Sequence, residues 1–369
     1  MLHTTGQMTT DVGRSYREND YICGMIKAFH CKYIIDGVPQ ELTPAGILSS
    51  VMEKALEPEP APETILDETL DPSPDTIQLE ASKVGEYLDA VMPFKGRMQV
   101  PFAAPCTRAR VAWALVDSAW RSGNFKLDDL PLTAKWTFEQ DKVGDMAAFY
   151  GSVESAADYI DAMRLNVRRV SCENGPFDLK IATPFSGAPR LVDDILHPDP
   201  QSWVIYVPFD TSDYRLGGSL LSQALGLRGG IAPQVTDADY FMDCFEVVRE
   251  LSEDGVLLSA ASVAEGGLYA ALGRMTAEGT GVCADISGIM RACGESDIVR
   301  ILFAEVPGAV IQIRDVDFDY IDAEFLLQDI AYFPLGHPLP GGGVRLEHSA
   351  RSGIQNILES LMQNAEGED

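Results

Sequence analysis

Beyond residue 79, apolar runs of strand length alternate with segments whose apolar residues recur at helical spacing, and this alternation constrains the fold most. Residues 202–209 read SWVIYVPF, a continuous apolar run of strand length. Residues 236–255 carry one apolar stripe at helical spacing, formed by Phe241, Cys244, Phe245, Val248 and Leu251. Alternation of this kind predicts a mixed α/β fold with buried strands.

The same patterns predict the other elements. We expect helices at 44–55, 107–123, 145–165, 220–226, 236–255, 267–275 and 320–329, and a final amphipathic helix through Ile354, Ile357, Leu358 and Leu361. We expect strands at 31–37, 130–138, 202–209, 256–260, 281–286, 309–315 and 331–336. Thr236 and Asp239 resemble a capping box at the start of the helix over 236–255.

An acidic, proline-rich stretch separates the first residues from the alternating region. Residues 57–76 read EPEPAPETILDETLDPSPDT, with five prolines, seven acidic residues and no Lys or Arg. Such a composition buries little apolar surface and repels itself, which predicts a semi-extended linker. The expected organisation is therefore an N-terminal appendage at 1–56, a linker at 57–78, and two domains at 79–198 and 199–369.

Charge and cysteine usage exclude several classes of partner. The chain has 56 Asp and Glu against 28 Lys and Arg, a net charge of −28. This field repels nucleic acids and anionic membranes, so we expect neither as a partner. No apolar run is long enough to span a bilayer, and the first residues lack a signal-peptide pattern. Seven scattered cysteines, without a C-x-x-C pair, favour free thiols in the cytoplasm.

Motifs that carry chemistry are scarce. Cys23, His30 and Cys31 are three metal-ligand types close in sequence, but no second knuckle follows and we expect no metal there. The chain lacks a Walker loop and a G-x-S-x-G elbow, and nothing nominates a catalytic residue. Two glycine turns, Leu216–Ser219 and Glu265–Leu268, each precede an expected helix. Their backbone amides could cradle a phosphate, or the glycines could permit close packing.

The two turns and their surroundings resemble a known family. WVIYVPFDTSDYRLGGS (203–219), ASVAEGGLYAALGRM (261–275) and FAEVPGAVIQI (303–313) are similar to the carboxy-terminal synthetase half of phosphoribosylformylglycinamidine synthases, of the AIR-synthase-like superfamily. FPLGHP (333–338) fits the same template, and RMQVPFAAP, RVAWALVDSAW and LTAKWTF match more faintly. The resemblance covers about Lys83 to Pro338.

The resemblance implies a fold and an activity. It implies a two-domain α/β (α+β) unit whose first domains pair into a shared barrel. It also implies ATP-dependent amidation of formylglycinamide ribonucleotide in purine biosynthesis, with ammonia from a glutaminase. We therefore expect a homodimer, or a heterodimer with a similar unit, that buries a sheet edge and an apolar face.

The chain departs from the family at the positions that carry chemistry. A His-Asp-x-Ser stretch becomes Ala261 to Ala264, and a Gly-Lys-Asp-Ser stretch becomes Val170 to Glu173, beside Arg168 and Arg169. Two expected asparagines become Asp117 and Lys135. A bound phosphate needs cations or amide donors, and magnesium needs carboxylates. These substitutions together therefore remove most of the side chains that would bind a nucleotide and its metal ion.

Three functions stay open. The first is a non-catalytic relative that binds a nucleotide or stabilises a partner. The second is a split or truncated subunit of an active ATP-dependent C–N ligase that needs a partner chain. The third is an unrelated role on the same fold.

A nucleotide-binding relative would bind ADP or ATP with magnesium. Its candidate nucleotide contacts are Gly217, Gly218, Ser219, Gly266, Gly267 and Lys135, and its candidate metal contacts are Asp117 and Glu305. A purely structural role is the alternative for each. If Gly267 contacts the nucleotide, Gly267→Arg is expected to abolish binding without unfolding the chain.

Overall fold

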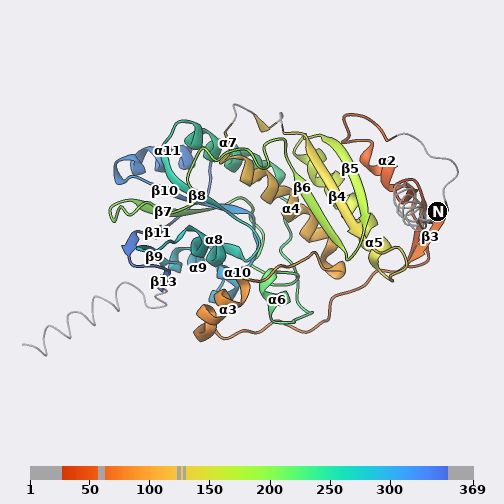
Figure 1. The fold of residues 1–369 in the computed structure, drawn as a ribbon, viewed down its shortest axis with the longest axis horizontal. Coiled ribbons are helices and arrows are strands. Elements are labelled where there is room, and N and C mark those ends of the chain that lie inside the picture. Colours follow the sequence, from red (N-terminus) through yellow and green to blue (C-terminus); the bar gives the residue numbers. More distant parts are fainter. Residues whose placement is uncertain (1–26, 57–62, 123–125, 128–129, 348–369) are drawn as a thin grey trace, which may run out of the picture.

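The computed structural model describes residues 27–347 except 57–62, 123–125 and 128–129. The described chain forms two halves, each built on a sheet with helices packed against it (Figure 1). One apolar core runs through both halves, because the helices α4 (Ala103–Ser118) and α5 (Asp145–Ala162) of the first half and α7 (Ala238–Glu253) of the second contribute to a single cluster. The mixed α/β fold expected from the sequence is confirmed. None of the described helices is both long and apolar enough to cross a membrane.

The first half is built on the sheet β5–β4–β6. Its elements are α4 (Ala103–Ser118), β4 (Leu132–Phe138), α5 (Asp145–Ala162), β5 (Val167–Asn174) and β6 (Asp178–Ala182). Strand β4 pairs in parallel with β5 and antiparallel with β6. Side chains of β4 alternate, so that Trp136 and Phe138 are fully buried against the helices. The expected strand at 130–138 and the expected helix at 145–165 are therefore confirmed, and the helix expected at 107–123 is present but begins at Ala103 and ends at Ser118.

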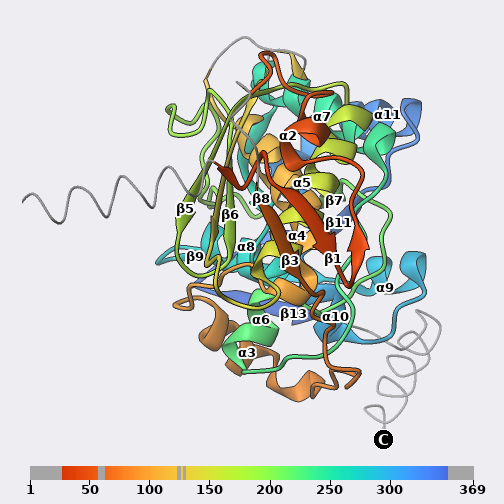
Figure 2. The ribbon, with the colours of Figure 1, turned by 90° about the vertical axis from the view of Figure 1, so that its right-hand side faces the viewer.

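The other face of this sheet is polar. Thr133, Lys135 and Thr137 of β4 alternate with the buried residues and are half-buried. Lys135 forms an ion pair with Glu173 of β5. On this face the side chains of β4 are polar, which differs from the apolar face that the resemblance led us to expect. In Figure 2 this sheet lies at the outer side of the molecule.

The second half is built on the antiparallel sheet β11–β7–β10–β8. Its strands are β7 (Trp203–Pro208), β8 (Leu257–Val263), β10 (Gly308–Ile313) and β11 (Phe333–Gly336). Helices α7 (Ala238–Glu253) and α11 (Phe318–Leu327) lie on one face of the sheet. Helices α8 (Gly267–Met275), α9 (Ser287–Cys293) and α10 (Ile298–Phe303) lie on the other (Figure 1). Because both faces are covered, Val204, Ile205, Tyr206 and Val207 of β7 are all buried, which explains the continuous apolar run.

Smaller elements complete this half. A second sheet contains β9 (Thr280–Asp285), β12 (Pro338–Pro340) and β13 (Val344–Glu347). Helix α3 (Val84–Val91) packs against α6 (Leu220–Ala224) and α8, so residues that the sequence placed in the first domain contact the second half. Short 3-10 turns lie at Ala81–Lys83, Val100–Phe102 and Asp315–Asp317.

The N-terminal unit is an integral part of the first half. It contains β1 (Lys32–Ile35), β2 (Val38–Pro39), α2 (Pro44–Leu48) and β3 (Thr64–Asp67). The Phe29 ring lies edge-on to Trp136 and Phe149, with centroids 6.0 and 5.3 Å apart. These contacts tie the unit to β4 and α5.

The described part of the expected linker is ordered. Strand β3 pairs in parallel with β1, which contradicts a semi-extended connection over residues 63–67. Three backbone amides at the start of α5 donate to the Asp67 carboxylate, each at 2.9 Å: Gly144 to Oδ1, and Met146 and Ala147 to Oδ2. Further along, the amide of Ser73 donates to the carbonyl of Arg228 at 3.3 Å. Asp67 is one of the acidic residues from which we expected self-repulsion. Its carboxylate instead accepts hydrogen bonds from backbone amides that have no acceptor within α5.

One capping assignment also differs from the expectation. The start of α7 is capped by Asp237, whose Oδ1 accepts from the amide of Tyr240 at 3.1 Å. The amide of Thr236 donates instead to Asp210 at 3.1 Å. The expected capping box of Thr236 and Asp239 is therefore wrong by one residue. The expected helix through Ile354 and Leu361 lies outside the described residues.

Candidate functional site

The two glycine turns meet at one buried carboxylate. Oε1 of Glu305 accepts hydrogen bonds from the amides of Leu220 and Gly266, both at 2.7 Å. Leu220 begins α6 and Gly266 caps α8, so two helix starts point at the same oxygen. The structure thus brings together, around Glu305, the two turns at 216–219 and 265–268 that the sequence analysis named as candidate nucleotide contacts.

Most of the nominated amide donors are already used within the chain. The amide of Gly217 donates to Ile231 at 2.8 Å, that of Ser219 to Leu216 at 3.2 Å, and that of Gly267 to Ala264 at 2.9 Å. With the bond from Gly266 to Glu305, four of the five nominated amides have a protein acceptor. A phosphate at these turns would have to displace those acceptors.

The glycines also permit close packing between backbone segments. A Cβ atom on Gly217 would lie 2.5 Å from the carbonyl carbon of Ile231. One on Gly267 would lie 2.7 Å from the carbonyl oxygen of Leu302, and Gly267 has a φ of +70°. Both positions therefore require glycine for internal reasons. The expectation that Gly267→Arg leaves the fold intact is wrong, because the new side chain has no room.

Burial dominates the electrostatics of Glu305. It raises the pKa of this carboxyl to about 7, against the opposing effect of the two amide hydrogen bonds. Arg110 lies nearby and pairs with Asp178 at 2.7 Å and with Glu265 at 3.5 Å. A carboxyl group with a raised pKa is a poor ligand for magnesium, which binds the ionised form.

The other nominated residues have partners of their own. Lys135 pairs with Glu173 on the sheet face of the first half. Asp117 pairs with Arg121, one helical turn later on α4, at 2.9 Å. Within the described residues, no group of three or more metal-ligating side chains is formed. Cys23, the first residue of the Cys–His–Cys cluster, lies outside that part of the chain.

Most of the stretch Ala261 to Ala264, before Gly266, belongs to strand β8, which ends at Val263. Ser262 accepts a hydrogen bond from the indole Nε1 of Trp120 at 2.9 Å. Ala261 pairs with Val310 of β10. Ser262 therefore joins the two halves through one hydrogen bond, whereas Ala261 contributes to the sheet of the second half.

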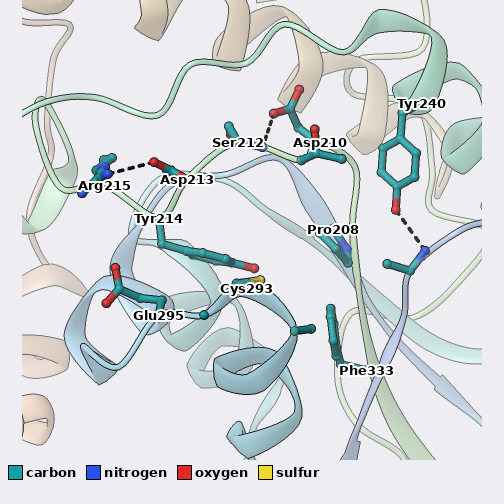
Figure 3. Close-up of a pocket in the computed structure, with 14 residues that line it drawn as sticks. Pro208, Asp210, Ser212, Asp213, Tyr214, Arg215, Tyr240, Cys293, Glu295 and Phe333 are labelled. Carbon is teal, nitrogen blue, oxygen red and sulfur yellow. Dashed lines mark hydrogen bonds and ion pairs between the residues drawn. The ribbon is translucent and has the colours of Figure 1, made fainter.

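Sequence reasoning missed a cavity of about 410 Å³ at the end of β7 (Figure 3). The cavity is lined by Pro208, Asp210, Thr211, Ser212, Asp213, Tyr214, Arg215, Tyr240, Ala292, Cys293, Gly294, Glu295, Ala331 and Phe333. Asp210 and Asp213 stand out in the sequence as an acidic loop, but its other residues come from segments up to about 120 positions away. Only the fold brings them together.

Comparison with known proteins gives a partial match. No family model matches the chain. Over 145 residues the chain is 28% identical to phosphoribosylformylglycinamidine synthase of Homo sapiens, a match that covers 39% of this chain and 10% of that relative. The chain is thus related to phosphoribosylformylglycinamidine synthase, and the resemblance found in the sequence is confirmed.

Solved structures with a similar arrangement include T. maritima PurL complexed with FGAR, at 11% identity and a TM-score of 0.47, covering 69% of this chain and 42% of that one. Thiamine-monophosphate kinase from Stenotrophomonas maltophilia K279a is 14% identical with a TM-score of 0.42, covering 68% of this chain and 80% of that one.

Proposed function

We propose that this chain is a non-catalytic relative of phosphoribosylformylglycinamidine synthase that acts in purine biosynthesis through its protein contacts. The observation that carries this proposal is the use of the glycine-turn amides inside the chain. Leu220 and Gly266 donate to Glu305, and Gly217, Ser219 and Gly267 donate to backbone carbonyls. A phosphate group would find few free donors at these turns.

The chemistry of ATP-dependent ligation supports the same proposal. Transfer of a phosphoryl group needs magnesium ligands and cations around the developing charge. The motif that precedes Gly266 offers Ala261, Ser262 and Ala264, of which Ser262 already bonds to Trp120. The net charge of −28 adds long-range repulsion of an anionic nucleotide.

Calorimetric titration with ADP and with ATP, both with magnesium, tests the proposal. We expect no saturable heat up to millimolar nucleotide, because four of the five nominated amides already have acceptors. Thermal unfolding of the same sample establishes that the protein is folded. Saturable binding in the micromolar range would overturn the proposal and favour the partner-dependent subunit of an active synthase.

We also propose that the polar face of β5–β4–β6 pairs with a similar unit, as a homodimer or a heterodimer. Lys135 and Lys180 lie opposite each other in the register of β4 and β6, and Glu173 follows on β5. Opposite charges on one face can pair across an isologous contact. Light scattering at micromolar concentration is expected to give twice the mass of one chain at low salt, and less in molar salt. A monomer at low salt would exclude a homodimer.

A further inference from the structure

Three aromatic rings from separate segments line the cavity at the end of β7. They belong to Tyr214 in the loop after β7, Tyr240 on α7 and Phe333 on β11. The Tyr240 hydroxyl accepts a hydrogen bond from the amide of Ala331 at 3.0 Å. Phe333 stacks on Tyr206, with centroids 6.3 Å apart and planes at 26°. Two of the three rings are therefore held in place, and Figure 3 shows all three around the same space.

Acidic side chains outnumber basic ones in the lining. Asp210, Asp213 and Glu295 contribute carboxylates, and Arg215 contributes the one guanidinium among the lining residues. Arg215 pairs with Asp213 at 2.8 Å, and Glu295 pairs with Arg300 at 3.2 Å. Two of the three carboxylates are thus neutralised by a neighbour.

Asp210 is the carboxylate without a cationic partner among the described residues. It is 4% exposed and accepts from the backbone amides of Ser212, Thr236 and Asp237, at 2.8, 3.1 and 3.2 Å. These bonds fix its orientation and compensate part of its negative charge, and no ion pair with a described cation adds to them. A buried carboxylate of this kind favours a positively charged neighbour.

The end of α9 adds partial negative charge. Ala292 and Cys293 form the last residues of this helix and line the cavity, and Gly294 ends it with a φ of +62°. The final carbonyl groups of a helix lack intrahelical donors and carry the negative end of its dipole. Carboxylate, helix end and aromatic faces therefore all favour the same sign of ligand charge.

We propose that this cavity binds a small organic ammonium ion. The aromatic rings would contact the alkyl groups around the nitrogen through cation–π attraction, and Asp210 would supply the counter-charge. A volume of about 410 Å³ suits a small organic molecule. The proposal uses no part of the glycine turns, so it stands independently of the function proposed above.

A matched pair of probes tests the sign of the charge. Choline carries a trimethylammonium group, and 3,3-dimethylbutan-1-ol carries a neutral group of the same shape. In calorimetric or NMR titrations we expect saturable binding of choline, with at least tenfold weaker binding of the neutral alcohol. Equal binding would show an apolar cavity without charge selection. No binding of choline up to 50 mM, roughly the affinity of one desolvated cation–π contact, would exclude the proposal.

Two variants separate this site from general effects on the fold. Asp210→Asn removes the charge and keeps one of the two acceptor oxygens that the three amides use, so thermal unfolding is measured beside it. It is expected to weaken choline binding at least tenfold. Asp199→Asn is the control, because Asp199 also accepts from the amide two residues later, at 3.0 Å, but does not line the cavity. Tyr240→Leu removes one ring and is expected to weaken choline more than the alcohol. Unchanged choline affinity in both cavity variants would place binding elsewhere.

Discussion

Replacing Glu305 with alanine is expected to lower the free energy of unfolding by about 4 kcal/mol. The substitution leaves the buried amides of Leu220 and Gly266 without an acceptor, at about 1–3 kcal/mol each, and adds a cavity. Denaturation in urea, followed by circular dichroism, measures the change. Glu265→Ala is the matched control, because the Glu265 side chain is 49% exposed and should change stability by less than about 1 kcal/mol.

Glu305→Gln is expected to change the pH dependence rather than remove the contact. The amide oxygen of glutamine can still accept from both turns. In the wild type, burial raises the pKa of Glu305 to about 7, so the native state binds this proton more tightly than the unfolded state does. The unfolding free energy contributed by this group therefore falls as the pH rises from about 4.5 to about 7, by at most about 3 kcal/mol.

Comparison of the two proteins between pH 5 and pH 8 isolates that contribution. Glutamine does not titrate, so the glutamine variant is expected to gain stability relative to the wild type as the pH rises. A difference that stays constant over this range would show that the native carboxyl titrates normally. Equal stability of the alanine and glutamine variants would show that the two amides do not depend on the acceptor.

Asp67→Ala is expected to lower the free energy of unfolding by about 2 kcal/mol. Its carboxylate accepts from three amides at the start of α5, and removal of a charged cap of this kind costs about 1–2 kcal/mol, more when several donors are lost. Asp67→Asn retains an acceptor oxygen and should lose less than half of this. Thermal unfolding and urea unfolding of both variants show whether their stabilities follow this order.

Glu68→Ala is the control for this position, because Glu68 is the exposed acidic neighbour on the same segment. It should leave stability within about 0.5 kcal/mol of the wild type. If Asp67→Ala behaves like Glu68→Ala, the start of α5 is satisfied by other means and the role assigned to β3 is incorrect.

Local pattern predicted much of the fold because periodicity reports burial. The run at 202–209 is continuous in apolar residues since β7 is covered on both faces. The stripe through Phe241 and Val248 is one-sided since α7 has a solvent face. Neither pattern depends on distant residues, so single-sequence reasoning could find both.

Features that depend on distant partners were not predictable in this way. Asp67 lies 77 residues before Gly144, and nothing in an acidic proline-rich stretch signals that one carboxylate caps a helix. The glycine turns were recognised, but composition could not show that their amides donate to Glu305 and to carbonyl groups. The polar face of the first sheet was missed for a different reason. The expectation of an apolar face came from the resemblance, whereas the alternation of Thr133, Lys135 and Thr137 is visible in the sequence.

The position of β3 has a consequence for how this protein can be divided. The region that resembles the synthases begins near residue 83, whereas Phe29 and Asp67 hold β4 and α5 from outside it. A recombinant fragment cut at the boundary suggested by homology would start translation after both of these residues. Its first half would lack part of its own interior, so a fragment that keeps these contacts has to begin at Phe29 or earlier.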